Sequence, residues 1–157
     1  MKKNNYPIYF LISLAVLIID QATKYLIQAR LKLFETVEVL PFFNIVFVSN
    51  TGSAFGMLKG LGNVFFIVVA GAAIVIVAVL IIKFREDRLA FSLVMGGAAG
   101  NLMDRLTHGY VVDFLDFFAG GHHWPAFNVA DSALTVGIAL LFIKTLFGPK
   151  DTGKQEV

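Results

Sequence analysis

Residues 64–82 read VFFIVVAGAAIVIVAVLII, nineteen consecutive residues without a charge. An α-helix rises about 1.5 Å per residue, so a run of this length crosses the hydrocarbon core of a bilayer, which is about 30 Å thick. Of the 157 residues in the whole chain, 57% are hydrophobic and only 15% are charged. A typical soluble domain is about a quarter charged. The stretch and its surroundings therefore predict an integral membrane protein.

Three further apolar stretches accompany this run. They are Ile8–Ile19, which continues in mixed form to Ile27, then Leu89–Met103 and Ser132–Ile143. Each is long enough to span only if polar residues occupy one of its ends, and polar residues inside a membrane are costly and usually functional. We expect a membrane all-α fold of four transmembrane helices, at about residues 8–30, 63–83, 89–107 and 130–147, in one domain covering residues 1–157. The N-terminal run lacks a small-residue cleavage site, so we expect it to remain as the first helix.

The distribution of Lys and Arg predicts the orientation of these helices. If the N-terminus is inside, eight Lys and Arg residues lie in inside segments and four in outside segments. Because inside loops carry the excess of Lys and Arg, both termini are expected in the cytoplasm. Residues 35–48, ETVEVLPFFNIVFV, then lie outside. Their β-branched and aromatic residues, broken by Pro41, predict short strands, so we expect a small outer β element over about residues 34–57.

In this topology the acids of several segments gather at one membrane face. Asp20 lies in the outer half of the first helix, Asp104 at the outer end of the third, and Asp131 at the outer start of the fourth. Asn50 and Asp113 lie in the outer segments. Asp113 falls within the apolar run VVDFL, where an isolated carboxylate should be neutralised or find a partner.

Structural interpretations of the same residues remain open. Asp20 and Lys24 have the i,i+4 spacing of a helix ion pair. Asp104 and Arg105 suit an anchor at the interface, because Arg extends towards lipid head groups.

The start of the fourth helix and the loop before it also have structural interpretations. Asn128 and Asp131 suit the N-cap and the third position of a helix. Asp116 has the pattern of a solvated loop acid. The segment GGAAG at residues 96–100 indicates close helix packing.

The acids suit general acid–base catalysis. Two carboxylates held close together do not both ionise easily, so one keeps a proton. The ionised carboxylate takes a proton from water while the protonated one donates to a carbonyl oxygen, as in an aspartic peptidase. Asp113 and Asp131 are the expected pair, because both lie at the outer interface on separate elements.

Other chemistry is disfavoured. The chain has no cysteine, which excludes disulfides and cysteine nucleophiles, and its net charge of +2 does not indicate nucleic-acid binding. His122 and His123 are neighbours that rarely share one ion, so we expect no metal and no cofactor. Two non-enzymatic functions stay open: a small proton- or cation-conducting membrane protein that uses Asp20, Asp104 and Asp131 as a relay, or a lipid-binding or assembly subunit.

Five motifs occur in order along most of the chain. They are DQATK at 20–24, NTGSAF at 50–55, GGAAGNLMDR at 96–105, VVDF at 111–114 and FNVADS at 127–132. Together they resemble the bacterial lipoprotein signal peptidase (signal peptidase II) family of four-helix aspartic peptidases. One motif would be weak, but five in this order on a four-span chain are highly specific.

The resemblance implies a site, a substrate and a location. Asp113 and Asp131 would be the catalytic pair. Substrate-binding or supporting roles are implied for Asp20, Lys24, Asn50, Gly52, Asn101, Arg105, Asn128 and Ala130. The implied substrate is a diacylglyceryl-modified prolipoprotein, cleaved just before its lipidated cysteine in contact with membrane lipids. The implied location is the bacterial inner membrane, with the site at the outer leaflet beneath a small extracytoplasmic β-cradle. We expect a monomer, because the glycine-rich segment can pack within one bundle.

Overall fold

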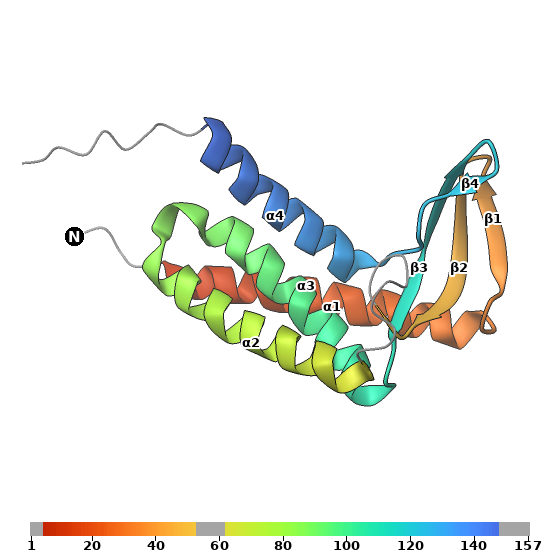
Figure 1. Cartoon of the computed structure of the whole chain (residues 1–157), viewed down its shortest axis with the longest axis horizontal. Helices are drawn as coiled ribbons and strands as arrows, with labels where there is room; N and C mark the ends of the chain where they lie inside the picture. The colour runs from red at the N-terminus through yellow and green to blue at the C-terminus, as the bar shows by residue number, and fades with distance from the viewer. Residues whose placement is uncertain (1–4, 53–61, 148–157) are drawn as a thin grey trace, which may run out of the picture.

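The computed structural model describes residues 5–52 and 62–147, and within them four long helices stand beside a four-stranded antiparallel sheet (Figure 1). The helices are α1 (Tyr6–Arg30), α2 (Gly62–Lys83), α3 (Arg88–Thr107) and α4 (Val129–Phe147), with a short 3-10 turn, η3 (Arg85–Asp87), before α3. The strands are β1 (Thr36–Leu40), β2 (Phe43–Asn50), β3 (Val111–Ala119) and β4 (His122–His123). Each helix begins and ends within two residues of the bounds expected from the sequence.

Three helices in the described ranges, α1, α2 and α4, are long and apolar enough to cross a membrane. The fourth span expected from the sequence corresponds to α3, which is less apolar and stays a prediction as a span. Its composition has a physical cause, because α3 packs against each of the other three helices and faces protein along much of its length. Buried small and polar residues therefore replace the apolar residues that a lipid-facing helix would carry.

Glycines bring the helices close together, as the segment at residues 96–100 predicts. A Cβ added at Gly96 of α3 would lie 2.7 Å from the carbonyl oxygen of Ser13 in α1. A Cβ at Gly97 would meet the carbonyl oxygen of Ala130 in α4, and one at Gly137 of α4 would lie 2.8 Å from the carbonyl oxygen of Ala90 in α3. The backbones of α1 and α4 thus approach α3 only because these positions lack a side chain.

The sheet stands at one end of the bundle and has the strand order β1-β2-β3-β4 (Figure 1). The strands β1 and β2 lie within the outer segment expected at residues 34–57, of which residues 53–57 are outside the described part of the chain. The strand β3 was not expected. Its first four residues, Val111–Phe114, are all buried, so the alternation of apolar and polar residues that marks a half-exposed strand is missing. In the β2–β3 register Val48 lies opposite Asp113 and Asn50 opposite Val111.

Candidate active site

Two acids lie on either side of Asn128 where the sheet joins the bundle, Asp113 on β3 and Asp131 in the first turn of α4. Asn128 connects them: its Nδ2 donates to Oδ1 of Asp113 at 2.7 Å, and its Oδ1 accepts the backbone N–H of Asp131 at 2.9 Å. Since α4 begins at Val129, Asn128 is the N-cap and Asp131 the third helical residue, as predicted from their spacing. The cap that starts the helix therefore also links the two acids.

Three asparagines point their amide groups at this pair, and a donor fixes the orientation of each. Asn101 accepts a hydrogen bond from Lys24 at 3.0 Å through Oδ1, so its Nδ2 faces Asp131 and donates to Oδ1 at 2.7 Å. Asn50 accepts the N–H of Gly52 at 3.0 Å, so its Nδ2 donates to Oδ2 of Asp113 at 2.9 Å. The third is the capping asparagine described above. A carboxamide whose oxygen is already bonded presents its NH2 group to the remaining partner.

Lys24 forms a buried ion cluster below the pair. Its Nζ lies 2.9 Å from Oδ2 of Asp20 and 3.0 Å from Oδ2 of Asp104, and all three side chains are at most 2% exposed. The predicted i,i+4 pair of Asp20 and Lys24 is confirmed. Gln21, which was not predicted as a site residue, donates to Oδ1 of Asp104 at 2.9 Å. Its position three residues before Lys24, on the same helix face, is the sequence signal that identifies it.

The two acids of this cluster also hold the polypeptide backbone. Oδ1 of Asp20 accepts the N–H of Ala130 at 2.8 Å, and Oδ2 of Asp104 accepts the N–H of Val112 at 2.9 Å. The interpretation of Asp104 and Arg105 as an interfacial anchor is wrong, because their side chains are 1% and 8% exposed. Both residues turn into the protein, where bonded partners compensate for their burial.

Arg105 closes the side of the site next to β2. Its Nη2 donates to the carbonyl oxygen of Gly52 at 2.7 Å, and its guanidinium lies 4.3 Å from the centre of the Phe66 ring. Its Nη1 is buried and has no hydrogen-bond partner in the described part of the chain. A buried donor without a partner costs roughly 1–3 kcal/mol, so this nitrogen is suited to a ligand.

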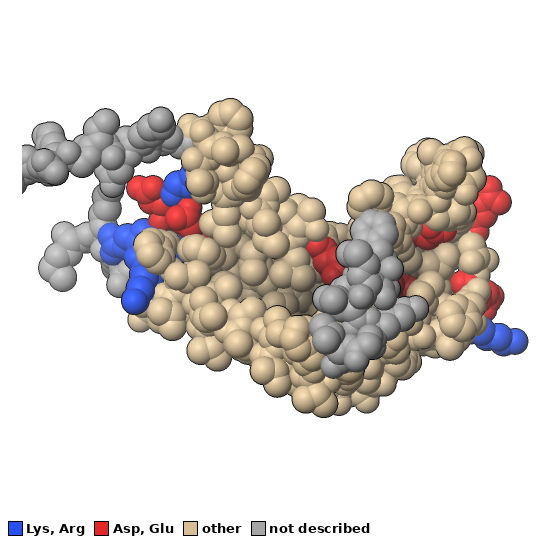
Figure 2. All heavy atoms as spheres, in the orientation of Figure 1, with Lys and Arg blue, Asp and Glu red and all other residues tan. Residues whose placement is uncertain are grey.

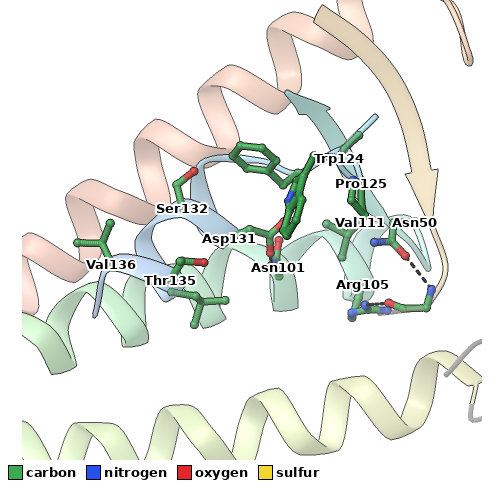
Figure 3. A pocket seen from close by; sticks show the side chains of 14 residues that line it. Asn50, Asn101, Arg105, Val111, Trp124, Pro125, Asp131, Ser132, Thr135 and Val136 are labelled. Atoms are coloured by element: carbon green, nitrogen blue, oxygen red, sulfur yellow. Dashed lines mark hydrogen bonds between the residues drawn. The ribbon is translucent and has the colours of Figure 1, made fainter. Parts of the chain in front are cut away.

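A cavity of about 650 Å³ opens beside these groups (Figure 3). It is lined by Asn50, Gly52, Asn101, Arg105, Val111, Asp131, the β4–α4 connection Trp124–Phe127, and Ser132 and Leu134–Val136 of α4. Acidic atoms are visible in the hollow between the helices and the sheet in Figure 2. No role was predicted for these residues of the β4–α4 connection and of α4 beyond Asp131. Phe127 and Ser132 stand in the motif FNVADS, whereas no charge or motif marks Trp124–Ala126 or Leu134–Val136.

The carboxyl group of Asp113 resists ionisation. Burial raises its pKa to about 7, and the negative charge of Asp131 acts in the same direction. The hydrogen bonds from Asn50 and Asn128 and the charge of Lys24 oppose the increase in the pKa of Asp113. Near neutral pH this pair of acids can therefore hold one proton, which is the state that acid–base catalysis requires.

Two further acids, Asp116 and Glu86, lie away from the pair. Asp116 is 7% exposed and accepts a hydrogen bond from Asn44 at 2.9 Å, with Nδ1 of His123 at 2.9 Å, so its interpretation as a solvated loop acid is wrong. Glu86 contacts Lys144 at 3.0 Å at the opposite end of the bundle. Among residues 5–52 and 62–147 no three His, Asp or Glu side chains are grouped as metal ligands.

Comparisons with known proteins identify relatives over nearly the whole chain. The family described as Signal peptidase (SPase) II matches residues 12–147. The lipoprotein signal peptidase of Thermodesulfovibrio yellowstonii is 47% identical over 131 residues, which cover 83% of this chain and 89% of that protein. That of Syntrophotalea carbinolica is 47% identical over 150 residues, covering 91% and 93%. A solved structure described as a bacterial membrane enzyme has a TM-score of 0.87 at 37% identity and covers 99% of this chain and 98% of that one.

Proposed function

The chain belongs to the signal peptidase II family, and from that premise we propose that it removes signal peptides from prolipoproteins with Asp113 and Asp131 as its catalytic pair. It is an aspartic peptidase, and the site geometry supports the choice of these two acids. The single observation that carries the proposal is the bridge through Asn128, which bonds to Asp113 on one side and to Asp131 on the other. The alternative of an ion-conducting protein has no comparable support, because Asp20 and Asp104 are paired with Lys24.

Asp131 acts as the base and Asp113 as the acid. Asp131 lines the cavity, and Asn101 bonds to its Oδ1, which leaves Oδ2 for a water molecule. Asp131 takes a proton from this water as the water oxygen attacks the carbonyl carbon, and Asp113 gives its proton to the carbonyl oxygen. When the tetrahedral intermediate collapses, the C–N bond breaks and the leaving amine takes the proton from Asp131. Asp113 recovers its proton from the hydroxyl group, so the cycle consumes one water.

Arg105 positions the peptide, whereas Asn50 donates to Asp113 and so belongs with the residues that support the pair. The free Nη1 of Arg105 and the cavity lining around Gly52 suit a backbone carbonyl of the substrate, which otherwise would lose its hydrogen bonds to water on entering the site. Five further residues support the pair through the contacts described above: Asp20, Lys24, Asn101, Asn128 and Ala130.

The bilayer explains the location of the site. A cysteine that carries diacylglycerol keeps its acyl chains in the membrane, so a bond just before it lies at the membrane boundary. The pair lies at the end of the bundle that joins the sheet, while Lys and Arg gather at the opposite end (Figures 1 and 2). The positive-inside rule then favours an inner-membrane protein with the sheet and the site outside and both termini in the cytoplasm. In this arrangement α3 is the fourth span.

The test is processing of a diacylglyceryl-modified prolipoprotein by the purified protein in lipid vesicles. Wild type should release the signal peptide, and Asp113→Asn and Asp131→Asn should each lower the rate by about 10²–10⁴-fold, the usual contribution of acid–base catalysis. Asp116→Asn is the matched control, because Asp116 contacts Asn44 and His123 elsewhere on the sheet, and it should retain activity. Full activity of either variant of the pair would refute the assignment.

A further inference from the structure

In the described part of the chain, all but one of the serine and threonine hydroxyl groups in the four helices make the same kind of hydrogen bond. Of the seven serines and threonines in α1 to α4, six donate to a backbone carbonyl three or four residues earlier in the chain. These six are Ser13, Thr23, Ser92, Thr107, Ser132 and Thr145. Such bonds satisfy a hydroxyl that would otherwise face an apolar environment. Thr135 in α4 makes no hydrogen bond within the described residues.

Thr135 lies on the cavity side of α4. It follows Asp131 by four residues, so the two side chains lie on the same helix face, about 6 Å apart along the helix axis. Both line the cavity, and Figure 3 shows Thr135 one turn beyond Asp131 on that wall. The adjoining face of α4 is packed, because Ala130 and Gly137 lie against α3. Two hydroxyls therefore face the candidate site: that of Ser132, which donates to the carbonyl oxygen of Asn128, and the unbonded one of Thr135.

We propose that Thr135 is a substrate-binding residue whose hydroxyl donates a hydrogen bond to a carbonyl oxygen of the lipid-modified substrate. This inference rests on the proposed function and extends it along α4, away from the sheet. A donor in a helix that spans a membrane has few partners, and the substrate brings carbonyl oxygens to this depth in its peptide and in its lipid esters. The side chain thus contacts the substrate on the far side of Asp131 from Asn50 and Arg105 (Figure 3).

The variant that isolates the hydroxyl is Thr135→Val, which keeps the shape of the side chain. Thr135→Ser restores the hydroxyl, and Thr145→Val makes the same exchange on α4 at an exposed position outside the cavity lining. One neutral hydrogen bond is worth about a two- to tenfold change in binding. We therefore expect Thr135→Val to raise KM for the lipidated substrate by about two- to tenfold with kcat little changed, Thr135→Ser to remain near wild type, and Thr145→Val to have no effect.

A second substrate identifies the acceptor. In a synthetic prolipoprotein peptide with ether-linked alkyl chains on the cysteine, the lipid carries no carbonyl oxygen. If the acceptor is an ester, wild type and Thr135→Val should share the same raised KM for this substrate. If it is a peptide carbonyl, the difference between them should persist. An unchanged KM for Thr135→Val with both substrates, while wild type processes them, would overturn the inference and leave the proposed function intact.

Discussion

The backbone N–H of Ala130 donates to Oδ1 of Asp20 at 2.8 Å, although 110 positions separate the two residues in the sequence. A matching bond joins the N–H of Val112 to Oδ2 of Asp104 at 2.9 Å. Ala130 and Val112 are each the residue immediately before one acid of the proposed catalytic pair. Lys24 contacts both accepting carboxylates. One buried cation thus positions both acids through the backbone, without contacting either of them directly.

The acceptor role of Asp20 is separable from its charge. Asp20→Ala should lower the free energy of unfolding in detergent by about 3–5 kcal/mol, because it breaks a buried ion pair and leaves the N–H of Ala130 without an acceptor. Asp20→Asn keeps an oxygen for that N–H and should lose less stability and less activity. Equal losses in the two variants, measured by thermal unfolding and by processing rate, would contradict a backbone role for Asp20.

Lys24 should matter for the orientation of Asn101 as well as for charge. Lys24→Met removes the donor to Oδ1 of Asn101 and leaves two buried carboxylates unpaired, so we expect a loss of both stability and kcat. The triple variant Lys24→Met, Asp20→Asn, Asp104→Asn removes the unpaired charges. It should recover much of the stability but little of kcat, because Asn101 then keeps only the longer hydrogen bond from Asn128, at 3.3 Å, to orient its amide group. Recovery of both quantities would show that Lys24 acts through charge balance alone.

The raised pKa of Asp113 predicts the pH dependence of activity. Because the acid must carry its proton, kcat/KM should fall as the pH rises through about 7, the pKa of Asp113. The hydrogen bond from Asn50 lowers this pKa, so Asn50→Ala should move the alkaline limb of the profile to higher pH. Measurement of kcat/KM against pH for the two proteins tests the sign, and a limb that moves to lower pH would be inconsistent with this role.

The same pKa of Asp113 has a consequence for stability. The ordinary pKa of an aspartate is 3.8, and burial raises the pKa of Asp113 in the folded protein to about 7. Between these values the folded state binds more protons than the unfolded state, so the contribution of Asp113 to stability falls as the pH rises from about 4 to about 7. Asp113→Asn does not titrate and should remove this part of the slope when unfolding is followed over that pH range.

Local spacing predicted the parts of the site that depend on local geometry. Asn128 and Asp131 stand three residues apart, which fixes their capping relationship, and Asp20 and Lys24 stand four apart on one helix. The glycine-rich segment at 96–100 indicated close packing of α3, and its neighbours in α1 and α4 confirm it. In each case the relevant contact follows from the period of a helix, which the sequence contains.

The errors arose where a contact depends on an unrecognised strand. Because Val111–Phe114 is buried throughout, β3 has no alternating pattern, and its pairing with β2 was not foreseen. Without β3 one partner of Asp104, the N–H of Val112, is missing, and without the pairing of β2 with β3 Asp116 has no reason to be buried beside Asn44. That these residues lie at one end of the helix bundle was predictable from the topology, but the direction of their side chains was not.

Close packing of α3 and α4 sets the position of Asp131, which gives a last test with an internal control. A methyl group at Gly97 would meet the carbonyl oxygen of Ala130 and lie 2.9 Å from Cγ of Leu134, whereas one at Gly71 of α2 has no neighbour within 4 Å. Gly97→Ala should cost about 1–3 kcal/mol of stability through overpacking and should lower kcat, because α4 must move away together with Asp131. Gly71→Ala should keep full activity and gain up to about 1 kcal/mol from helix propensity. Thermal unfolding and processing assays on the two variants compare the same chemical change at a packed and an open position, and equal behaviour of the two would show that α4 is not held by this contact.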